Sequence, residues 1–375
     1  MSRTRGEAEG QSPFTQLPFT HYNGRAMNNS AAPPPEALDK YRPVLEQAMQ
    51  ALVPAEAAGT DALYTMLRYH MGWIDQHGHV LEGGSAGKAL RPTLCFLTCE
   101  GLGCPWPQAA TAAATLEFIH NFTLIHDDIQ DGDVERRGKP TVWAVWGVGP
   151  ALWAGNAMRV LSDRALAAEG APLHKRSQAS RLLTEAYLEI LEGQYLDLEF
   201  ERRAEVGVPE YLDMISRKTG ALIRCSVEMG ALLATEDRET AVALRQWAVH
   251  LGRAFQVRDD ILGIWGDPSL TGKAVGNDIR RKKKTFPVMY GFERATGAGR
   301  AALQSVYALP DLDQGCVDIV LAVLEESGAD RRAQALVDSE SELALESLAK
   351  VTERLTPWAH QQMVQLTYFL ARRDK

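Results

Sequence analysis

Aspartates at two places in the chain follow apolar helical patterns, and their spacing suits a divalent cation. In the segment 116–133, apolar residues recur every three or four positions and then give way to Asp127, Asp128 and Asp131. Asp127 and Asp131 are four residues apart, so on a helix their carboxylates lie on the same face. Two such carboxylates repel each other unless a cation lies between them. Because Mg²⁺ binds one or two carboxylates together with substrate phosphates, the segment predicts a helix end that holds a phosphate-bound metal.

The segment 255–267 repeats this arrangement, with an apolar helical pattern that contains the adjacent aspartates Asp259 and Asp260. Basic residues follow both aspartate segments. After the first come Arg136, Arg137 and Lys139, and after the second come Lys273 and the basic run 280–284, which includes Lys283. Either aspartate pair alone is equally compatible with a solvated helix end. Burying four or five carboxylates together is unfavourable without cations. We therefore expect the two helix ends to face each other across one cavity that binds metal and phosphate.

Lys88 and Arg91 form a further candidate phosphate-binding pair, after a Gly-rich stretch at 83–87. The segment is not a Walker phosphate loop, because Glu82 replaces its first glycine and Ala89 replaces the Ser or Thr that binds Mg²⁺. A Lys and an Arg three residues apart on a helix still suit a diphosphate, which Arg binds in bidentate fashion. An exposed basic turn is the alternative interpretation.

The doublet His126-Asp127 also occurs in helical metal-dependent phosphohydrolases, which gives a rival interpretation of the first segment. That class explains one metal site but gives no role to Asp259 and Asp260, or to Lys88 and Arg91. It also does not need the four-residue aspartate spacing.

The composition fits a globular protein with one large core or two domains, and it argues against some other classes. The chain has 375 residues, 45% hydrophobic and 23% charged, with a formal net charge of −8, which argues against a general nucleic-acid binder. Residues 1–35 are polar and lack the apolar core of a secretory signal, and we expect them to form a disordered leader. The five cysteines show no close CxxC spacing, which favours a reduced, cytoplasmic protein.

Helical patterns dominate residues 36–375, and no period-2 strand pattern is convincing. We expect a single all-α domain, a helical bundle around a central apolar cavity. The uncharged stretch 141–158 is long enough for a membrane span, but Gly147, Gly149 and Pro150 interrupt it, so we expect a buried helix instead. The expected helices cover residues 38–53, 61–77, 88–100, 107–131, 150–168, 173–200, 209–234 and 238–265, with shorter ones up to 373.

In these residues the chain resembles the trans-isoprenyl diphosphate synthases, or polyprenyl synthetases, and most closely the geranylgeranyl diphosphate synthases. The resemblance covers roughly residues 80–290, and six motifs occur in the family's order and spacing. They are Gly87-Lys88-x-x-Arg91-Pro92, Asp127-Asp128-x-x-Asp131 with Arg136-Arg137-Gly138, Gly193-Gln194-x-x-Asp197, Lys218-Thr219, Phe255-Gln256 with Asp259-Asp260, and Gly272-Lys273 with Lys283-x-Thr285-x-Pro287.

The resemblance implies a role for each matching residue. The proposed ligands of a cluster of three Mg²⁺ ions, formed with substrate bound, are Asp127, Asp131 and Asp259, supported by Asp128. The cations matching the allylic diphosphate site are Arg136, Lys218, Lys273 and Lys283. The residues matching the isopentenyl diphosphate pocket are Lys88, Arg91, His120 and Arg137. The polar groups expected near the carbocation are Thr219, Gln256 and Gln194.

The implied activity is an Mg²⁺-dependent condensation of isopentenyl diphosphate with dimethylallyl, geranyl or farnesyl diphosphate. Metal ions and cations stabilise the departing diphosphate, so that the allylic C–O bond ionises, and an apolar slot keeps water from the carbocation. The isopentenyl double bond then attacks, and loss of a proton leaves a chain five carbons longer. A nucleophilic side chain is unnecessary, and the sequence offers no convincing one.

Product length follows from the helix that carries Asp127, because the prenyl tail is expected to run down it. Phe122 lies five residues before Asp127, and Phe118 lies one further turn down, about 5.4 Å deeper. With Phe122 as the floor, and Thr123 beside it, the resemblance implies a C20 product, geranylgeranyl diphosphate. An ordinary core role for Phe122 remains the alternative, and farnesyl (C15) or longer-chain synthesis is the nearest competing activity.

Two departures from the family pattern are visible. Gly263 stands where the second motif usually has a third aspartate, and Asn156 stands where an aspartate is common. The alternatives on the same fold are a terpene cyclase, which does not need Lys88 or Arg91, and a non-catalytic subunit of a hetero-oligomeric synthase. The resemblance also implies a homodimer.

Overall fold

A computed structural model describes residues 33–54, 59–81, 87–168, 172–203, 206–271 and 274–374, which form an all-α protein. The predicted leader 1–35 therefore lies almost wholly outside the described residues. The α-helices are α1 (Ala37–Lys40), α2 (Arg42–Leu52), α3 (Asp61–His70), α4 (Leu90–Gly101), α5 (Ala110–Gln130), α6 (Val142–Trp146), α7 (Val148–Ala167), α8 (Leu173–Arg202), α9 (Val208–Ile215), α10 (Ala221–Ala234), α11 (Arg238–Trp265), α12 (Pro268–Thr271), α13 (Asn277–Arg280), α14 (Phe286–Arg294), α15 (Gly297–Ala308), α16 (Gln314–Glu326), α17 (Ala329–Ala349) and α18 (Pro357–Arg372).

The other elements are short. They are the 3-10 turns η1 (Trp106–Ala109) and η3 (Thr352–Arg354), the π-helical turn η2 (Ser216–Gly220), and the strands β1 (Glu135–Arg136) and β2 (Lys139–Pro140), which pair as an antiparallel hairpin.

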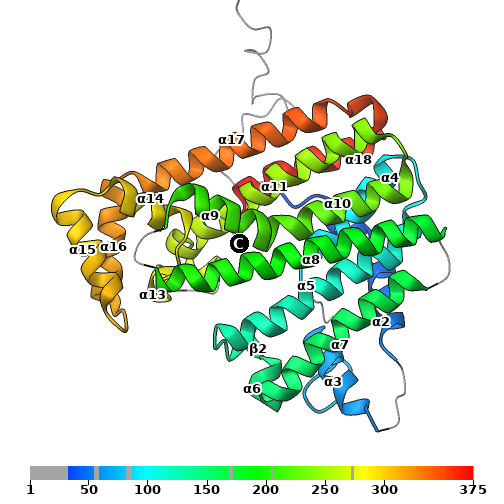
Figure 1. The fold of residues 1–375 in the computed structure, drawn as a ribbon, viewed down its shortest axis with the longest axis horizontal. Helices are drawn as coiled ribbons and strands as arrows, with labels where there is room; N and C mark the ends of the chain where they lie inside the picture. Colours follow the sequence, from blue (N-terminus) through cyan, green and yellow to red (C-terminus); the bar gives the residue numbers. More distant parts are fainter. Residues whose placement is uncertain are drawn as a thin grey trace, which may run out of the picture.

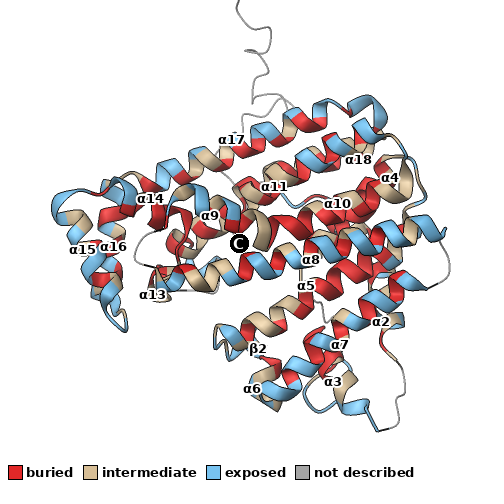
Figure 2. Cartoon of the chain, viewed as in Figure 1, coloured by how far each residue is buried: buried red, intermediate tan, exposed pale blue. Residues whose placement is uncertain are grey.

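The long helices pack side by side around α4 and α10, which are buried on nearly all faces (Figures 1 and 2). One hydrophobic cluster joins α1–α5, α7, α8, α10, the first half of α11 and α18. A second cluster joins the end of α8, α9, the end of α11, α13–α16 and the first half of α17. Helices α13–α16 lie at one end of the molecule in Figure 1. The second halves of α8 and α11 therefore run between the two clusters, and this is where the candidate site lies.

Two predicted helices end differently in the structure. The segment predicted as a helix over 61–77 stops at His70, because Gly72 adopts a left-handed φ of 79°. The segment predicted over 209–234 is not one regular helix, since the π-turn η2 separates α9 from α10. Short π segments inside helices occur frequently at functional sites, and η2 carries Lys218 and Thr219.

The uncharged stretch 141–158 forms α6 and the first half of α7, which are separated at Gly147 (φ 88°). The prediction of a buried helix was wrong in part, because Trp153 is 68% exposed. Among the described residues, the structure contains no helix with the length and apolarity needed to span a bilayer.

Candidate active site between the two aspartate segments

The first aspartate segment ends α5 with carboxylates in two environments. Asp127 lines a cavity of about 380 Å³, and its partial burial raises its pKa to about 6, with a further upward contribution from Asp131, although Lys218 opposes the shift. Asp128 is instead buried and accepts a hydrogen bond of 2.6 Å from Nε of Arg136. Burial likewise raises the pKa of Asp128 to about 6, although the Arg136 guanidinium opposes this shift. The two carboxylates therefore differ: Asp127 faces the cavity, and Asp128 anchors the hairpin.

The hairpin after α5 brings two arginines to the site. Its turn residues Arg137 and Gly138 both have positive φ, 54° and 74°, which is the backbone of a tight two-residue hairpin turn. Arg136 and Arg137 line the 380 Å³ cavity together with Asp127. The positive φ of Arg137 is uncommon for a residue with a side chain. Its guanidinium Nη2 lies 2.8 Å from the point where a Cβ on Gly87 would be, so the hairpin and the 87–91 segment are in contact.

A second, smaller cavity contains all four residues predicted to bind isopentenyl diphosphate. Lys88, Arg91, His120 and Arg137 line this space of about 170 Å³, and the last three also line the 380 Å³ cavity. Burial, followed by the charges of Arg91 and Arg137, lowers the pKa of His120 well below its usual value. Buried Glu117 lines the same small cavity and is a countercharge to Arg91. Three basic groups around one small space suit an anion, which would also stabilise a protonated His120.

The π-turn η2 delivers a lysine and a threonine opposite α5. A Cβ on Gly193 of α8 would lie 2.3 Å from the backbone N of Lys218, so only glycine permits this close approach of α8 to η2. Lys218 Nζ forms an ion pair of 2.5 Å with Asp197 of α8. The hydroxyl of Thr219 donates to Oε1 of Gln256 at 2.6 Å. Lys218, Thr219 and Gln256 line the same cavity as Asp127.

The aspartates of the second segment also divide their roles. Asp260 is buried and accepts hydrogen bonds from the Tyr211 hydroxyl, the backbone N of Phe286 (2.9 Å) and Nε2 of Gln256 (3.1 Å). Burial raises its pKa to about 7, although these hydrogen bonds oppose the shift. Asp259 is more open, and its carboxylate forms an ion pair with the guanidinium of Arg373, just after α18. The two aspartates therefore differ: Asp260 positions neighbouring elements, and Asp259, the one of the pair predicted as a metal ligand, has a cationic partner.

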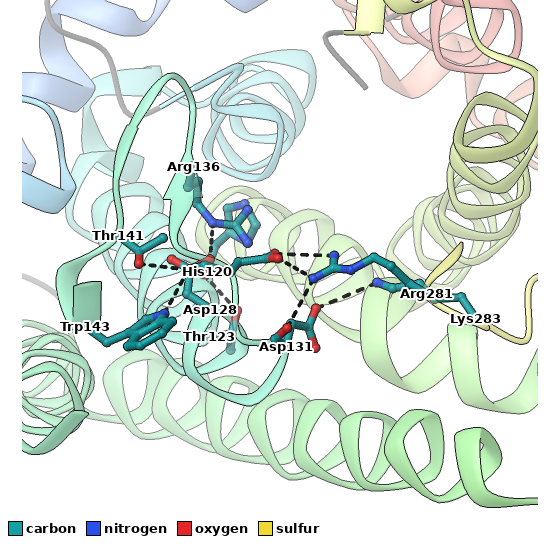
Figure 3. Close-up of polar contacts among 10 residues, drawn as sticks. His120, Thr123, Asp128, Asp131, Arg136, Thr141, Trp143, Arg281 and Lys283 are labelled. Carbon is teal, nitrogen blue, oxygen red and sulfur yellow. Dashed lines mark hydrogen bonds and ion pairs between the residues drawn. The ribbon is translucent and has the colours of Figure 1, made fainter. Parts of the chain in front are cut away.

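Basic residues after α13 reach across to the first aspartate segment. Figure 3 shows Arg281 and Lys283 reaching towards the end of α5, where Asp131 lies. Arg281 pairs with the carboxylate of Asp133, and Lys283 Nζ lies 3.8 Å from Oδ2 of Asp131. Lys283 also lines a cavity with Asp259, and Asp259 lines the 380 Å³ cavity with Asp127, so the two aspartate segments face each other.

These carboxylates fit a metal that arrives together with phosphate. Among the residues that the structure describes, no three His, Cys, Asp or Glu side chains converge closely enough to hold an ion alone. Asp127 and Asp131 nevertheless form a like-charged pair four residues apart, and Arg373 already neutralises Asp259. Mg²⁺ needs only one or two carboxylates when phosphates and water complete its shell. Asp127, Asp131 and Asp259 are therefore suited to hold Mg²⁺ against a diphosphate.

The residues predicted to form the floor lie on α5, before Asp127. Phe122 is 2% exposed and lines the 380 Å³ cavity with Thr123, and its ring packs against those of His126 (4.7 Å) and Tyr187 (5.5 Å). Phe118 is completely buried and lies outside the lining of that cavity. Phe122 is therefore the α5 aromatic that meets the cavity first.

The structure places the other predicted residues as follows. Gln194 lines the cavity and donates to Gln130 at 2.8 Å. Lys273 lies outside the described residues. Sequence reasoning missed Arg373, because nothing in the sequence pairs it with an aspartate 114 positions away. It also missed the contact between Arg281 and Asp133.

Comparison with known proteins agrees with this geometry. The polyprenyl synthetase family model matches residues 78–324. The chain is 42% identical over 262 residues to a (2E,6E)-farnesyl diphosphate synthase of Mycobacterium tuberculosis, covering 69% of this chain and 72% of that protein. It is 37% identical over 307 residues to a geranylgeranyl diphosphate synthase of the same species, covering 82% and 85%.

A similar solved structure is a polyprenyl synthetase from Streptomyces coelicolor, with a TM-score of 0.81, 33% identity, and coverage of 89% of this chain and 98% of that one. The sequence matches, the all-α fold and the two facing aspartate segments agree with one another. The chain therefore belongs to the polyprenyl synthetases, a family of trans-isoprenyl diphosphate synthases.

Proposed function

We propose that this protein is an Mg²⁺-dependent prenyltransferase that condenses isopentenyl diphosphate with an allylic diphosphate and makes geranylgeranyl diphosphate. One observation carries this proposal: a small basic cavity opens beside a larger cavity that contains both aspartate segments. Arg91, His120 and Arg137 line both spaces. Two adjoining anion sites suit a reaction between two diphosphates, whereas a phosphohydrolase or a terpene cyclase needs only one.

The larger site takes the allylic diphosphate. Asp127, Asp131 and Asp259 would hold Mg²⁺, which supplies positive charge against the diphosphate as it departs. Lys218 and Lys283 face these carboxylates from η2 and from the segment after α13. They orient the diphosphate and stabilise the charge that develops on it. Each of these lysines already contacts an aspartate, so the cations are positioned before substrate binds.

The smaller site takes isopentenyl diphosphate through Lys88, Arg91, His120 and Arg137. The hydroxyl of Thr219 already donates to Gln256, so the hydroxyl and amide oxygens present polar, uncharged groups to the reacting carbons. The apolar part of the 380 Å³ cavity is lined by Phe122, Leu124, Ile190, Leu191 and Phe255. These apolar side chains exclude water from the carbocation, which water would otherwise trap as an alcohol.

The C20 product is supported by the position of Phe122, which lies under the cavity with Tyr187 behind it. The relatives leave the length open, since they include a farnesyl, a geranylgeranyl and a geranylfarnesyl diphosphate synthase, the first of these at the highest identity of the three, 42%. Farnesyl diphosphate (C15) is therefore the second candidate product.

A homodimer is supported by apolar side chains on the outer faces of α7 and α8, which pack together. On α7, Trp153 and Val160 are 68% and 64% exposed and lie seven residues apart, on one face. On α8, Leu188 and Tyr195 are 56% and 70% exposed with the same spacing. Such an exposed patch marks an interaction surface, and we propose that a second copy of this chain covers it.

Separate substitutions test the two diphosphate sites. Lys88→Gln, at the one of the four basic positions that lines only the smaller cavity, is expected to raise KM for isopentenyl diphosphate at least tenfold while leaving KM for the allylic substrate within about threefold, because each lost charge-assisted hydrogen bond contributes about 1.5–3 kcal/mol. Lys283→Gln is expected to have the opposite preference. Exposed Arg181→Gln on α8 serves as the charge control. Equal effects of both changes on both substrates would contradict the assignment of two sites.

A further inference from the structure

The second aspartate segment lacks the pair of carboxylates that marks the first one. On α5, Asp127 and Asp131 are four residues apart, on one helix face. On α11, the residue four positions after Asp259 is Gly263, which has no side chain. From α11 alone, Asp259 therefore has no carboxylate neighbour one turn further on.

The carboxylate of Asp278 fills the missing position. A Cβ built on Gly263 would lie 2.0 Å from Oδ2 and 2.6 Å from Cγ of Asp278, so this carboxylate occupies the space of a side chain at 263. Asp278 belongs to α13, fifteen residues further along the chain. Because Asp259 and Gly263 share a face of α11, Asp278 reaches the face on which the open carboxylate of Asp259 lies.

The backbone around α13 holds this arrangement in place. The N–H of Gly276, just before α13, donates to the carbonyl of Ile264 on α11 at 2.9 Å. The N–H of Lys283, just after α13, donates to the carbonyl of Asp278 at 2.9 Å. The backbone that carries Asp278 is thus held between α11 and the segment whose lysine reaches Asp131.

The surroundings of Asp278 suit a cation. Asp259, Gly263 and Asp278 line one cavity of about 340 Å³, together with Lys218 and Lys283. Within the described part of the chain, no donor forms a hydrogen bond or an ion pair with the Asp278 carboxylate. A partly buried carboxylate gains free energy when a cation joins it in such a place.

We propose that Asp278 supplies, from α13, the second carboxylate that acts with Asp259 in holding Mg²⁺ on the α11 side of the allylic diphosphate. This inference rests on the proposed function. It gives Gly263 a role: a side chain there would meet the Asp278 carboxylate in its present position. It also means that binding of the metal fixes α13, and with it the basic residues Arg281 and Lys283, against the first aspartate segment.

The test uses Mg²⁺ with inorganic pyrophosphate as the probe, and reads the rise in melting temperature of the full chain. Asp278→Asn keeps the size of the side chain and removes its charge. We expect the Mg²⁺ concentration for half-maximal stabilisation to rise about tenfold, as for loss of about 1.4 kcal/mol of binding free energy. The exposed acid Asp311, mutated to Asn, controls for net charge and should leave the value unchanged. An unchanged value in Asp278→Asn would overturn the inference.

A transplant of the carboxylate separates a metal role from a structural one. Asp278→Ala should weaken the Mg²⁺ response, and Gly263→Asp should do so through the clash with Asp278. The double variant Gly263→Asp/Asp278→Ala should recover most of the response, because its carboxylate now comes from α11. A double variant no better than Asp278→Ala would also overturn the inference. If the unaltered protein showed no Mg²⁺-dependent stabilisation by pyrophosphate, the proposed function would fail together with it.

Discussion

Replacing Phe122 by alanine should lengthen the product by one isoprene unit. Phe122 is the α5 aromatic that meets the cavity, and its removal opens a path along the helix towards Phe118, which lies four residues deeper. With a rise of 1.5 Å per residue, the added depth is about 6 Å, close to one extended isoprene unit. The Tyr187 ring, 5.5 Å from Phe122, borders the new space. The expected main product is therefore C25 in place of C20.

The assay incubates each variant with farnesyl diphosphate and labelled isopentenyl diphosphate, then separates the dephosphorylated alcohols by length. Core Phe→Ala changes cost about 3–5 kcal/mol, and we expect the lower end because Phe122 already borders a cavity. Phe118→Ala is the matched control: it removes an equally buried ring but leaves Phe122 in place, so the product should not change. A folded, active Phe122→Ala enzyme with an unchanged product distribution would refute the floor assignment.

Three further predictions concern charge and assembly. Arg373→Gln frees the Asp259 carboxylate, and such a partly exposed ion pair is worth up to about 1 kcal/mol, so the Mg²⁺ concentration for half-maximal activity should fall up to about fivefold. A rise of this concentration in a Mg²⁺ titration would argue against competition between Arg373 and Mg²⁺ for Asp259. Arg281→Gln should lower the free energy of unfolding by less than about 1 kcal/mol but raise KM for the allylic diphosphate several-fold, so an unchanged KM in steady-state kinetics would contradict a substrate-site role for this contact. Trp153→Glu should convert dimer to monomer in light scattering, whereas the exposed Ile319→Glu on α16 should not, and a Trp153→Glu dimer would place the interface elsewhere.

Hydrophobic periodicity predicted the long helices well, because their buried faces repeat with the helical period. The bounds predicted for α11, 238–265, agree with the structure, and those for α5 and α8 differ by at most a few residues. Local backbone events were missed. The π-turn at Ser216–Gly220 leaves no mark in the apolar pattern, and the stop after His70 depends on the conformation of one glycine.

The site was predictable where spacing along one helix determines geometry, as for Asp127 and Asp131. Neighbouring residues on a helix point about 100° apart, which is why Asp259 pairs with Arg373 while Asp260 is buried and bonded to Tyr211. The pairing of Arg373 with Asp259 depends on how α18 packs against α11, and local sequence carries no signal for such a contact.

One measurement tests the central claim most directly. The purified protein is incubated with Mg²⁺, labelled isopentenyl diphosphate and, in separate reactions, dimethylallyl, geranyl or farnesyl diphosphate, and the dephosphorylated products are identified. The proposed function predicts a linear C20 alcohol in all three reactions, dependent on Mg²⁺ and lost in Asp127→Asn. A C15 product would keep the reaction and move the floor. Cyclic hydrocarbons without added label, or no product with any primer, would contradict the assignment as a prenyl diphosphate synthase.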